Sequence, residues 1–197
     1  MRVRVAVLLC VAALMVLIAG VGGVSAVQLY TSPAHTTTVA VGAPFTWTAR
    51  HIRFTSGNKM TLNTCTHSLL HAHVTGNSGG IVRYTVTDGT FSGCNSPVTF
   101  TGSWTVHQFG FPVHIIDPVF GTMFVWPAKW TKVKFHTLGG DYLGDLTTGI
   151  GQAQDATGTD IGAYAQDAGT FSGPLTGTGK FDYLYKRLGA AATWSLT

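Results

Sequence analysis

The sequence predicts an all-β protein, an antiparallel β-sandwich or barrel with one disulfide, preceded by a signal peptide. Short segments in which apolar and polar residues alternate are separated by clusters of Gly, Asn, Asp, Ser and Pro, which is the pattern of strands joined by turns. All eight acidic residues are Asp, and the chain is rich in Thr, Val and its 25 Gly. Because this composition disfavours long helices, strands are the expected elements.

The N-terminal segment has the features of a secretory signal. Arg2 and Arg4 precede an almost unbroken apolar run from Val5 to Ile18, and Val24-Ser25-Ala26 offers a small-residue cleavage site. This order of basic, apolar and small residues predicts that residues 1–26 are a signal peptide. An uncleaved anchor is the alternative, because the segment from Val5 to Val21 is nearly long enough to span a bilayer.

Residues 27–197 are expected to form a single all-β domain. They make up 171 of the 197 residues, which suits one domain and is enough to bury a core. The formal net charge of +4 falls to +2 without Arg2 and Arg4. A charge this small, in an exported chain, argues against nucleic acid as the partner.

Two cysteines, Cys65 and Cys94, follow the signal segment. An even number of cysteines in an exported chain predicts a disulfide between them. The bridge would close a loop of about 30 residues, which stabilises the folded state by about 3–4 kcal/mol in the chain-entropy model. Two free thiols or two metal ligands are the alternative.

The clearest strands surround this bridge. Apolar residues alternate with polar ones over 70–74 and again over 82–86, with a Gly-rich turn at 76–80 between them. This is the pattern of a β-hairpin. A second turn is expected at Asp88-Gly89, before the chain reaches Cys94. Four later apolar residues share one parity and are expected to face the same interior: Val98, Phe100, Trp104 and Val106.

The remaining segments are assigned in the same way. A strand over 45–54 changes parity near Arg50-His51, which predicts a bulge or a bend there. Residues 130–138 form a clear strand, whereas 151–169 is poor in large apolar residues and is expected to be a long loop or an edge segment. Further strands are expected at 36–41, 142–150, 181–185 and, as the closing strand anchored by Trp194, 191–197.

The features around the two cysteines resemble those of a loose group of small secreted actinobacterial all-β proteins of unknown function. The shared pattern is a strand with a first Cys, a Gly-containing hairpin, an F-S-x-C sequence and a short G-x-W strand. In this chain these are Cys65, Gly76–Gly80, Phe91–Cys94 and Gly102–Trp104. The order of features is also similar, more faintly, to the alkane-oxidation activator family. Members often carry a further cysteine pair, which this chain lacks, and no catalytic residue can be carried over from them.

His67, His71 and His73 are the nearest approach to a metal site in the sequence. In an extended strand His71 and His73 share a face, and imidazoles at that spacing can bind zinc or copper. However, the apolar residues of 70–74 form the opposite face, so both histidines are expected to face solvent. The sequence places no third ligand. His71 and His73 are therefore weak metal candidates, and no cofactor is expected.

Lys129, Lys132, Lys134 and His136 form a basic stripe on and beside the strand at 130–138. Such a stripe could bind an anionic ligand, such as an anionic lipid or polysaccharide. A solvated strand face, whose lysines also protect a sheet edge from pairing with other chains, is the simpler interpretation.

The sequence carries no recognisable catalytic motif. It contains neither G-x-S-x-G nor H-E-x-x-H. The favoured function is an exported non-enzymatic β-protein of the cell envelope or extracellular space, a binding or structural module of unknown ligand, for which a cell-wall polysaccharide and a membrane surface are the candidate partners. One alternative is a membrane-active oligomeric β-barrel of the pore type, in which aromatic residues from Phe109 to Trp130 form girdles. The other is a secreted enzyme without a recognisable motif.

Overall fold

The computed structural model describes residues 27–56, 61–117, 121–155, 160–173 and 177–197; the predicted signal peptide lies outside the described residues. The prediction of an all-β antiparallel fold is confirmed. The elements are, in chain order, β1 (Leu29–Tyr30), β2 (Pro44–Ser56), β3 (Thr61–Ser78), β4 (Ile81–Cys94), β5 (Val98–Phe100), β6 (Trp104–Phe109), β7 (Val113–Asp117), β8 (Gly121–Thr137), β9 (Gly140–Asp155), β10 (Asp160–Ser172), β11 (Gly177–Arg187), the 3-10 helix η1 (Gly189–Thr193) and β12 (Ser195–Leu196).

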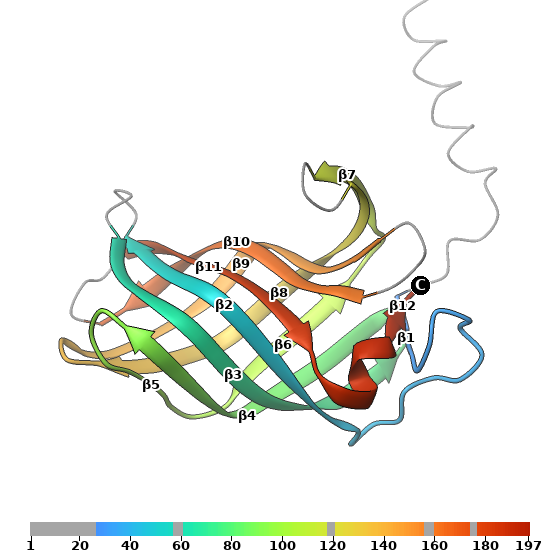
Figure 1. Ribbon diagram of the computed structural model, residues 1–197, viewed down its shortest axis with the longest axis horizontal. Coiled ribbons are helices and arrows are strands. Elements are labelled where there is room, and N and C mark those ends of the chain that lie inside the picture. Colours follow the sequence, from blue (N-terminus) through green and yellow to red (C-terminus); the bar gives the residue numbers. More distant parts are fainter. Residues whose placement is uncertain (1–26, 57–60, 118–120, 156–159, 174–176) are drawn as a thin grey trace, which may run out of the picture.

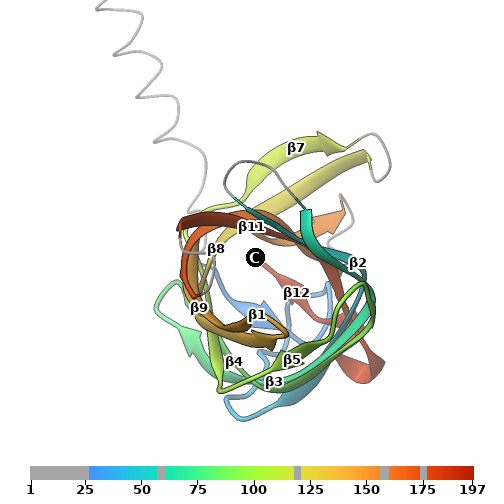
Figure 2. The same ribbon diagram turned by 90° about the vertical axis from the view of Figure 1, so that its left-hand side faces the viewer.

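Eight strands close into a barrel (Figures 1 and 2). The strands β2, β3, β4, β6, β8, β9, β10 and β11 pair antiparallel, each with the next in this order, and β11 pairs back with β2. The sequence left a sandwich and a barrel open, and the β2–β11 pairing decides for the barrel. A barrel of this strand number has an interior about wide enough for its own side chains.

Four short strands lie outside this ring. β5 bridges β4 and β8 beyond the stretch in which β6 joins them. β1 and β12 form a separate two-stranded sheet near the end of the barrel at which the C-terminus lies (Figure 1). In the described part of the chain β7 pairs only with β8, and it lies outside the ring of strands in the view along the barrel (Figure 2).

The core is a cluster of aromatic side chains inside the barrel. Five of the largest are at most 2% exposed: Trp47, Tyr84, Trp104, Trp130 and Tyr185. The Trp47 ring centroid lies 5.6 Å from those of Tyr84 and Trp130 and 6.2 Å from that of Tyr185. The strand parity predicted from the sequence is thus confirmed for Tyr84 and Trp104. The part of the interior that these residues line is filled by their own rings.

The hairpin predicted around residues 70–86 is present, with a shorter turn. β3 continues to Ser78, which pairs with Ile81, so the turn consists of Gly79 and Gly80 alone. Their φ values of +62° and +76° suit a two-residue hairpin turn, in which both residues have positive φ. The second turn predicted at Asp88-Gly89 is wrong, because β4 runs without a break from Ile81 to Cys94.

A bulge replaces that second turn. The β3–β4 register shifts by one residue between His71 and Ala72, opposite 86–88. Gly89 then crosses so close to β3 that a Cβ atom on it would lie 2.5 Å from Cδ2 of Leu70. Asp88 and Gly89, which indicate a turn in the sequence, therefore lie at a bulge and at a close approach of two backbones instead.

The bulge predicted in β2 near Arg50-His51 is confirmed. The register between β11 and β2 shifts between Asp182 and Tyr185, opposite the stretch from Ala49 to Arg53. Ala49 and Ile52 are both buried although they differ in parity. The bulge therefore lets the whole length of β2 keep its apolar residues inside the barrel.

Three segment predictions are wrong. Residues 36–41 form no strand, and only Thr38 makes a single bridge with Tyr30. The described residues of 151–169 belong to β9 and β10, and β10 lies between β9 and β11 rather than at an edge. Residues 191–197 do not close the barrel; they contain part of η1 and the two-residue β12. Trp194 is nevertheless buried, as expected.

Candidate functional site

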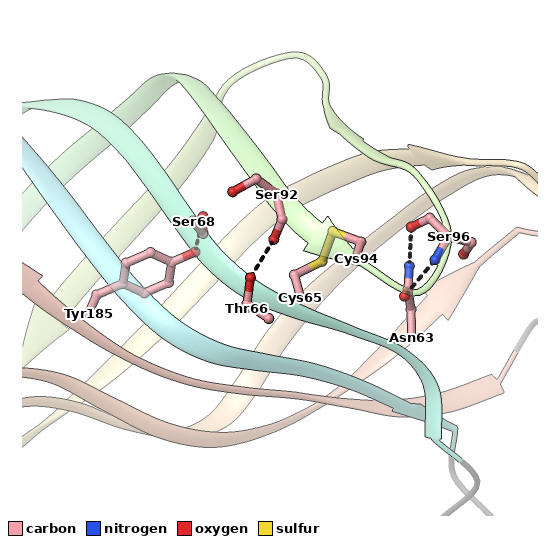
Figure 3. Close-up of a disulfide and its surroundings, with 8 residues drawn as sticks. All are labelled: Asn63, Cys65, Thr66, Ser68, Ser92, Cys94, Ser96 and Tyr185. Atoms are coloured by element: carbon pink, nitrogen blue, oxygen red, sulfur yellow. Dashed lines mark hydrogen bonds between the residues drawn. A yellow bond between two sulfur atoms is a disulfide. The ribbon is translucent and has the colours of Figure 1, made fainter.

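The predicted Cys65–Cys94 disulfide is present, with an S–S distance of 2.05 Å (Figure 3). The two cysteines lie directly opposite each other on β3 and β4. Beside them, the Asn63 side chain donates to the Ser96 carbonyl at 2.8 Å and accepts from the Ser96 N–H at 3.2 Å. The bridge therefore fixes the β3–β4 register at the end away from the hairpin turn. A disulfide is typical of proteins in oxidising compartments.

The three histidines of β3 lie on the outside of the barrel. His67 and His71 are exposed and His73 is half-buried. His67 and His71 contact threonines of the neighbouring strand, with 2.9 Å between His67 Nε2 and Thr48 Oγ1 and 3.3 Å between His71 Nδ1 and Thr46 Oγ1. Within the described ranges no three His, Cys, Asp or Glu side chains are grouped so that they could hold a metal ion.

The predicted basic stripe on β8 is interrupted by an acidic partner. Asp141, at the start of β9, lies 3.2 Å from Lys134 Nζ and 2.7 Å from His136 Nδ1. Hydrogen bonds from His136 and then Lys134 lower the pKa of the Asp141 carboxyl. Lys132 has a φ of +59° and its N–H donates to Asp145 Oδ1 at 2.9 Å. The positive charge of this half of the stripe is therefore partly neutralised by Asp141. Its residues also contact β9 and so stabilise the β8–β9 pair.

Lys129 belongs instead to a row of basic side chains that crosses three strands. In register, Arg83 of β4 lies opposite His107 of β6, and His107 lies opposite Lys129 of β8. Arg83 is exposed, and His107 and Lys129 are half-buried. The residues before and after each of the three in its strand are buried. Because side chains alternate along a strand, all three point outward. We call these three residues the cationic row.

A positive charge on His107 is electrostatically unfavourable within the cationic row. Cβ atoms of directly opposed residues on neighbouring strands are about 4.5–5.5 Å apart, and like charges there repel. Partial burial, the Arg83 charge and the Lys129 charge, in that order, lower the pKa of His107 below its ordinary value of 6.5. A bound anion would relieve this repulsion, which makes the row the best candidate for a binding site on the described surface.

The rows on either side of the cationic row differ from it in chemistry. On one side Thr85, Thr105 and Thr131 lie in register across the same three strands. On the other side Ile81 of β4 lies opposite Phe109 of β6, and Phe109 is 41% exposed. The outer face of β4, β6 and β8 therefore carries a hydroxyl row and then the cationic row, and β4 and β6 continue it with the apolar pair of Ile81 and Phe109.

Sequence reasoning found Lys129 but missed its two neighbours in the row. Arg83 and His107 each occupy a solvent position in an alternating strand, which is a signal the sequence does contain. Their alignment with Lys129 depends on the β4–β6 and β6–β8 registers, which the sequence does not specify. The alignment of the three residues could therefore not be predicted from the sequence alone.

Another basic residue, Arg187, is buried at the end of β11. Its guanidinium carbon lies 5.6 Å from the Trp194 ring centroid, 5.8 Å from that of Phe45 and 6.0 Å from that of Tyr84. Nη2 donates to the Tyr84 hydroxyl at 3.3 Å, and that hydroxyl donates to Gln108 Oε1 at 2.6 Å. Aromatic faces stabilise a cation that is removed from water. Arg187 thus ties β11 to β4, β6 and the C-terminal segment.

The aromatic residues invoked for a membrane girdle do not share one face. Trp126 and Trp130 are buried, whereas Phe109 and Phe111 are exposed. Within the part of the chain that the structure describes, no helix is long and apolar enough to cross a lipid bilayer.

Comparisons of the chain with protein-family models, with curated proteins and with solved structures find no match. The resemblance to exported actinobacterial proteins therefore stays a prediction.

Proposed function

We propose that this chain is an exported, non-enzymatic binding module of the cell envelope, and that it holds an anionic envelope component on the outer face of β4, β6 and β8. The cationic row of Arg83, His107 and Lys129 is the observation that carries the proposal. Arg83 and Lys129 flank His107, which its lowered pKa keeps uncharged at neutral pH, so an anion that lies across the row meets two positive charges with an imidazole between them.

Two further observations support this proposal. The Cys65–Cys94 disulfide suits an oxidising compartment, in agreement with the predicted signal peptide. The described interior is packed with aromatic rings such as Trp47 and Trp130, which suits a rigid scaffold that binds on its outside.

The test is a binding measurement on the oxidised chain of residues 27–197. Dextran sulfate serves as the anionic probe, neutral dextran as its control, and affinity is measured by calorimetry at low and at physiological salt. We expect dextran sulfate to bind, neutral dextran not to bind, and the affinity to fall as salt rises, because salt screens exposed charges.

Two matched variants localise the site. Arg83→Gln and Arg50→Gln each remove one positive charge, but Arg50 is exposed on β2, outside the cationic row. We expect Arg83→Gln to weaken binding several-fold and Arg50→Gln to change it little. Equal losses in the two variants would mean that only net charge matters, and the proposed site would then be wrong.

A further inference from the structure

Exposed apolar side chains are concentrated next to the cationic row. Of the eight large apolar residues that are exposed in the described part of the chain, four fall within eight consecutive positions: Phe109, Phe111, Val113 and Ile116. Ile116 is 86% exposed. The other four are scattered over the N-terminal segment, the β8–β9 turn, β9 and the end of β11. Single exposed apolar residues are ordinary, whereas a cluster of them indicates an interaction surface.

The backbone presents this cluster away from the barrel. β6 and β7 follow each other along the same edge of β8, β6 opposite 128–131 and β7 opposite 121–125. The β7–β8 hairpin projects beyond the ring of strands (Figures 1 and 2). We call residues 109–116, which lead from the end of β6 into this hairpin, the apolar segment.

The apolar segment and the cationic row are arranged in layers. Phe109 and His107 are two residues apart on one face of β6, a separation of about 7 Å in an extended strand. Thr105 follows after the same interval. Moving from the hairpin along β6, a surface first meets apolar side chains, then cations, then hydroxyl groups. A bilayer leaflet presents hydrocarbon, phosphate and water in this order over comparable depths.

We propose that the apolar segment and the cationic row together form a docking surface for an anionic lipid bilayer, with the apolar segment inserted below the level of the phosphates. The inference rests on the proposed function, because it uses the same cationic row and names its partner. The positive charges of Arg83 and Lys129 beside the apolar segment favour an anionic surface over an uncharged partner. Edge-to-edge pairing of β7 with a second copy is the competing occupant.

The test is co-sedimentation of the oxidised chain of residues 27–197 with vesicles. One set contains phosphatidylcholine alone, and the other contains phosphatidylcholine and phosphatidylglycerol in equal parts. Binding is expected with the anionic vesicles only. Each cation near an anionic surface is worth about fivefold in affinity, so Arg83→Gln is expected to weaken vesicle binding about fivefold and Arg50→Gln less.

Ile116→Asp and Leu138→Asp form the decisive pair. Both side chains are highly exposed, 86% and 80%, but Leu138 lies in the β8–β9 turn, away from the apolar segment. Ile116→Asp removes an inserting side chain and adds a negative charge, and we expect it to weaken vesicle binding about tenfold or more. Leu138→Asp, with the same change of charge, is expected to weaken it much less. Both variants should keep the affinity of the parent chain for dextran sulfate to within a small factor.

The outcomes separate this inference from the proposed function. If Arg83→Gln weakens binding to both probes but Ile116→Asp and Leu138→Asp bind vesicles equally well, the cationic row stands and bilayer insertion is overturned. If the chain binds dextran sulfate but no vesicles, the partner is not a bilayer. If it binds neither, the proposed function fails as well. A concentration-dependent dimer in analytical ultracentrifugation, abolished by Ile116→Asp and accompanied by no vesicle binding, would assign the apolar segment to a second copy.

Discussion

Arg83 and His107 face each other on the solvent side of the β4–β6 pair, and the pKa of His107 is lowered as a result of burial and of the neighbouring charges. A basic residue opposite a basic residue is an unfavourable cross-strand pair. The proposed anion site rests on this arrangement.

The first prediction concerns the titration of His107. Replacing Arg83 by Gln removes one of the charges that disfavour its protonation, so the pKa of His107 is expected to rise in Arg83→Gln. Arg50→Gln should leave it unchanged. The imidazole resonances followed by NMR against pH provide the measurement. A pKa for His107 that is the same in all three proteins would contradict the electrostatic account of the row.

The same shift makes stability depend on pH. Because the pKa of His107 is lower in the folded state than its ordinary value of about 6.5, the unfolded chain takes up this proton first on acidification. The contribution to stability is complete above that ordinary value and is lost as pH falls toward the folded-state pKa. His107→Gln should therefore lose less stability than the parent chain between neutral and mildly acidic pH. Denaturant unfolding at a series of pH values measures the difference.

The second prediction concerns Trp104 in the core. It is fully buried, its ring lies 4.6 Å from that of Phe100 and its Nε1–H donates to the Lys134 carbonyl at 3.0 Å. Trp104→Ala should lower the free energy of unfolding by about 3–5 kcal/mol. Urea unfolding of the oxidised protein measures this. A loss below about 1 kcal/mol, the range of surface substitutions, would mean that Trp104 does not face the core.

The third prediction concerns the disulfide. Replacing both Cys65 and Cys94 by Ala removes a cross-link between residues 29 positions apart in the chain. We expect the free energy of unfolding to fall by about 2–4 kcal/mol, largely because the unfolded chain regains freedom. The barrel should persist by far-UV circular dichroism. Unchanged stability in the double variant would show that the bridge is incidental to folding.

The fourth prediction concerns the buried hydroxyl pair. Ser68 Oγ and Tyr185 Oη lie 2.9 Å apart, and neither residue is exposed to solvent (Figure 3). Tyr185→Phe leaves the Ser68 hydroxyl without this partner and should cost about 1–3 kcal/mol. The double variant Ser68→Ala/Tyr185→Phe should lose less free energy of unfolding than the two single variants lose together. Strict additivity would indicate that the two hydroxyls are not coupled.

The sequence by itself determined the class of fold and much of the core. Alternation along a strand is a local property, because successive side chains point to opposite faces. For this reason the inward positions of Tyr84 and Trp104 and the bulge in β2 could be predicted before any strand was paired. The disulfide could be predicted as well, since only two cysteines follow the signal segment.

The tertiary structure decided what depends on pairing between distant strands. β10 is rich in small residues and carries little periodic signal, yet its backbone hydrogen bonds to β9 and β11 hold it inside the sheet. The closure of β11 on β2 joins residues more than one hundred positions apart, such as Tyr185 and Ala49. The cationic row depends on register in the same way. A shift of one residue in the β4–β6 pairing would turn Arg83 away from His107, and the same shift in the β6–β8 pairing would turn Lys129 away from it. Nothing local in the sequence fixes either register.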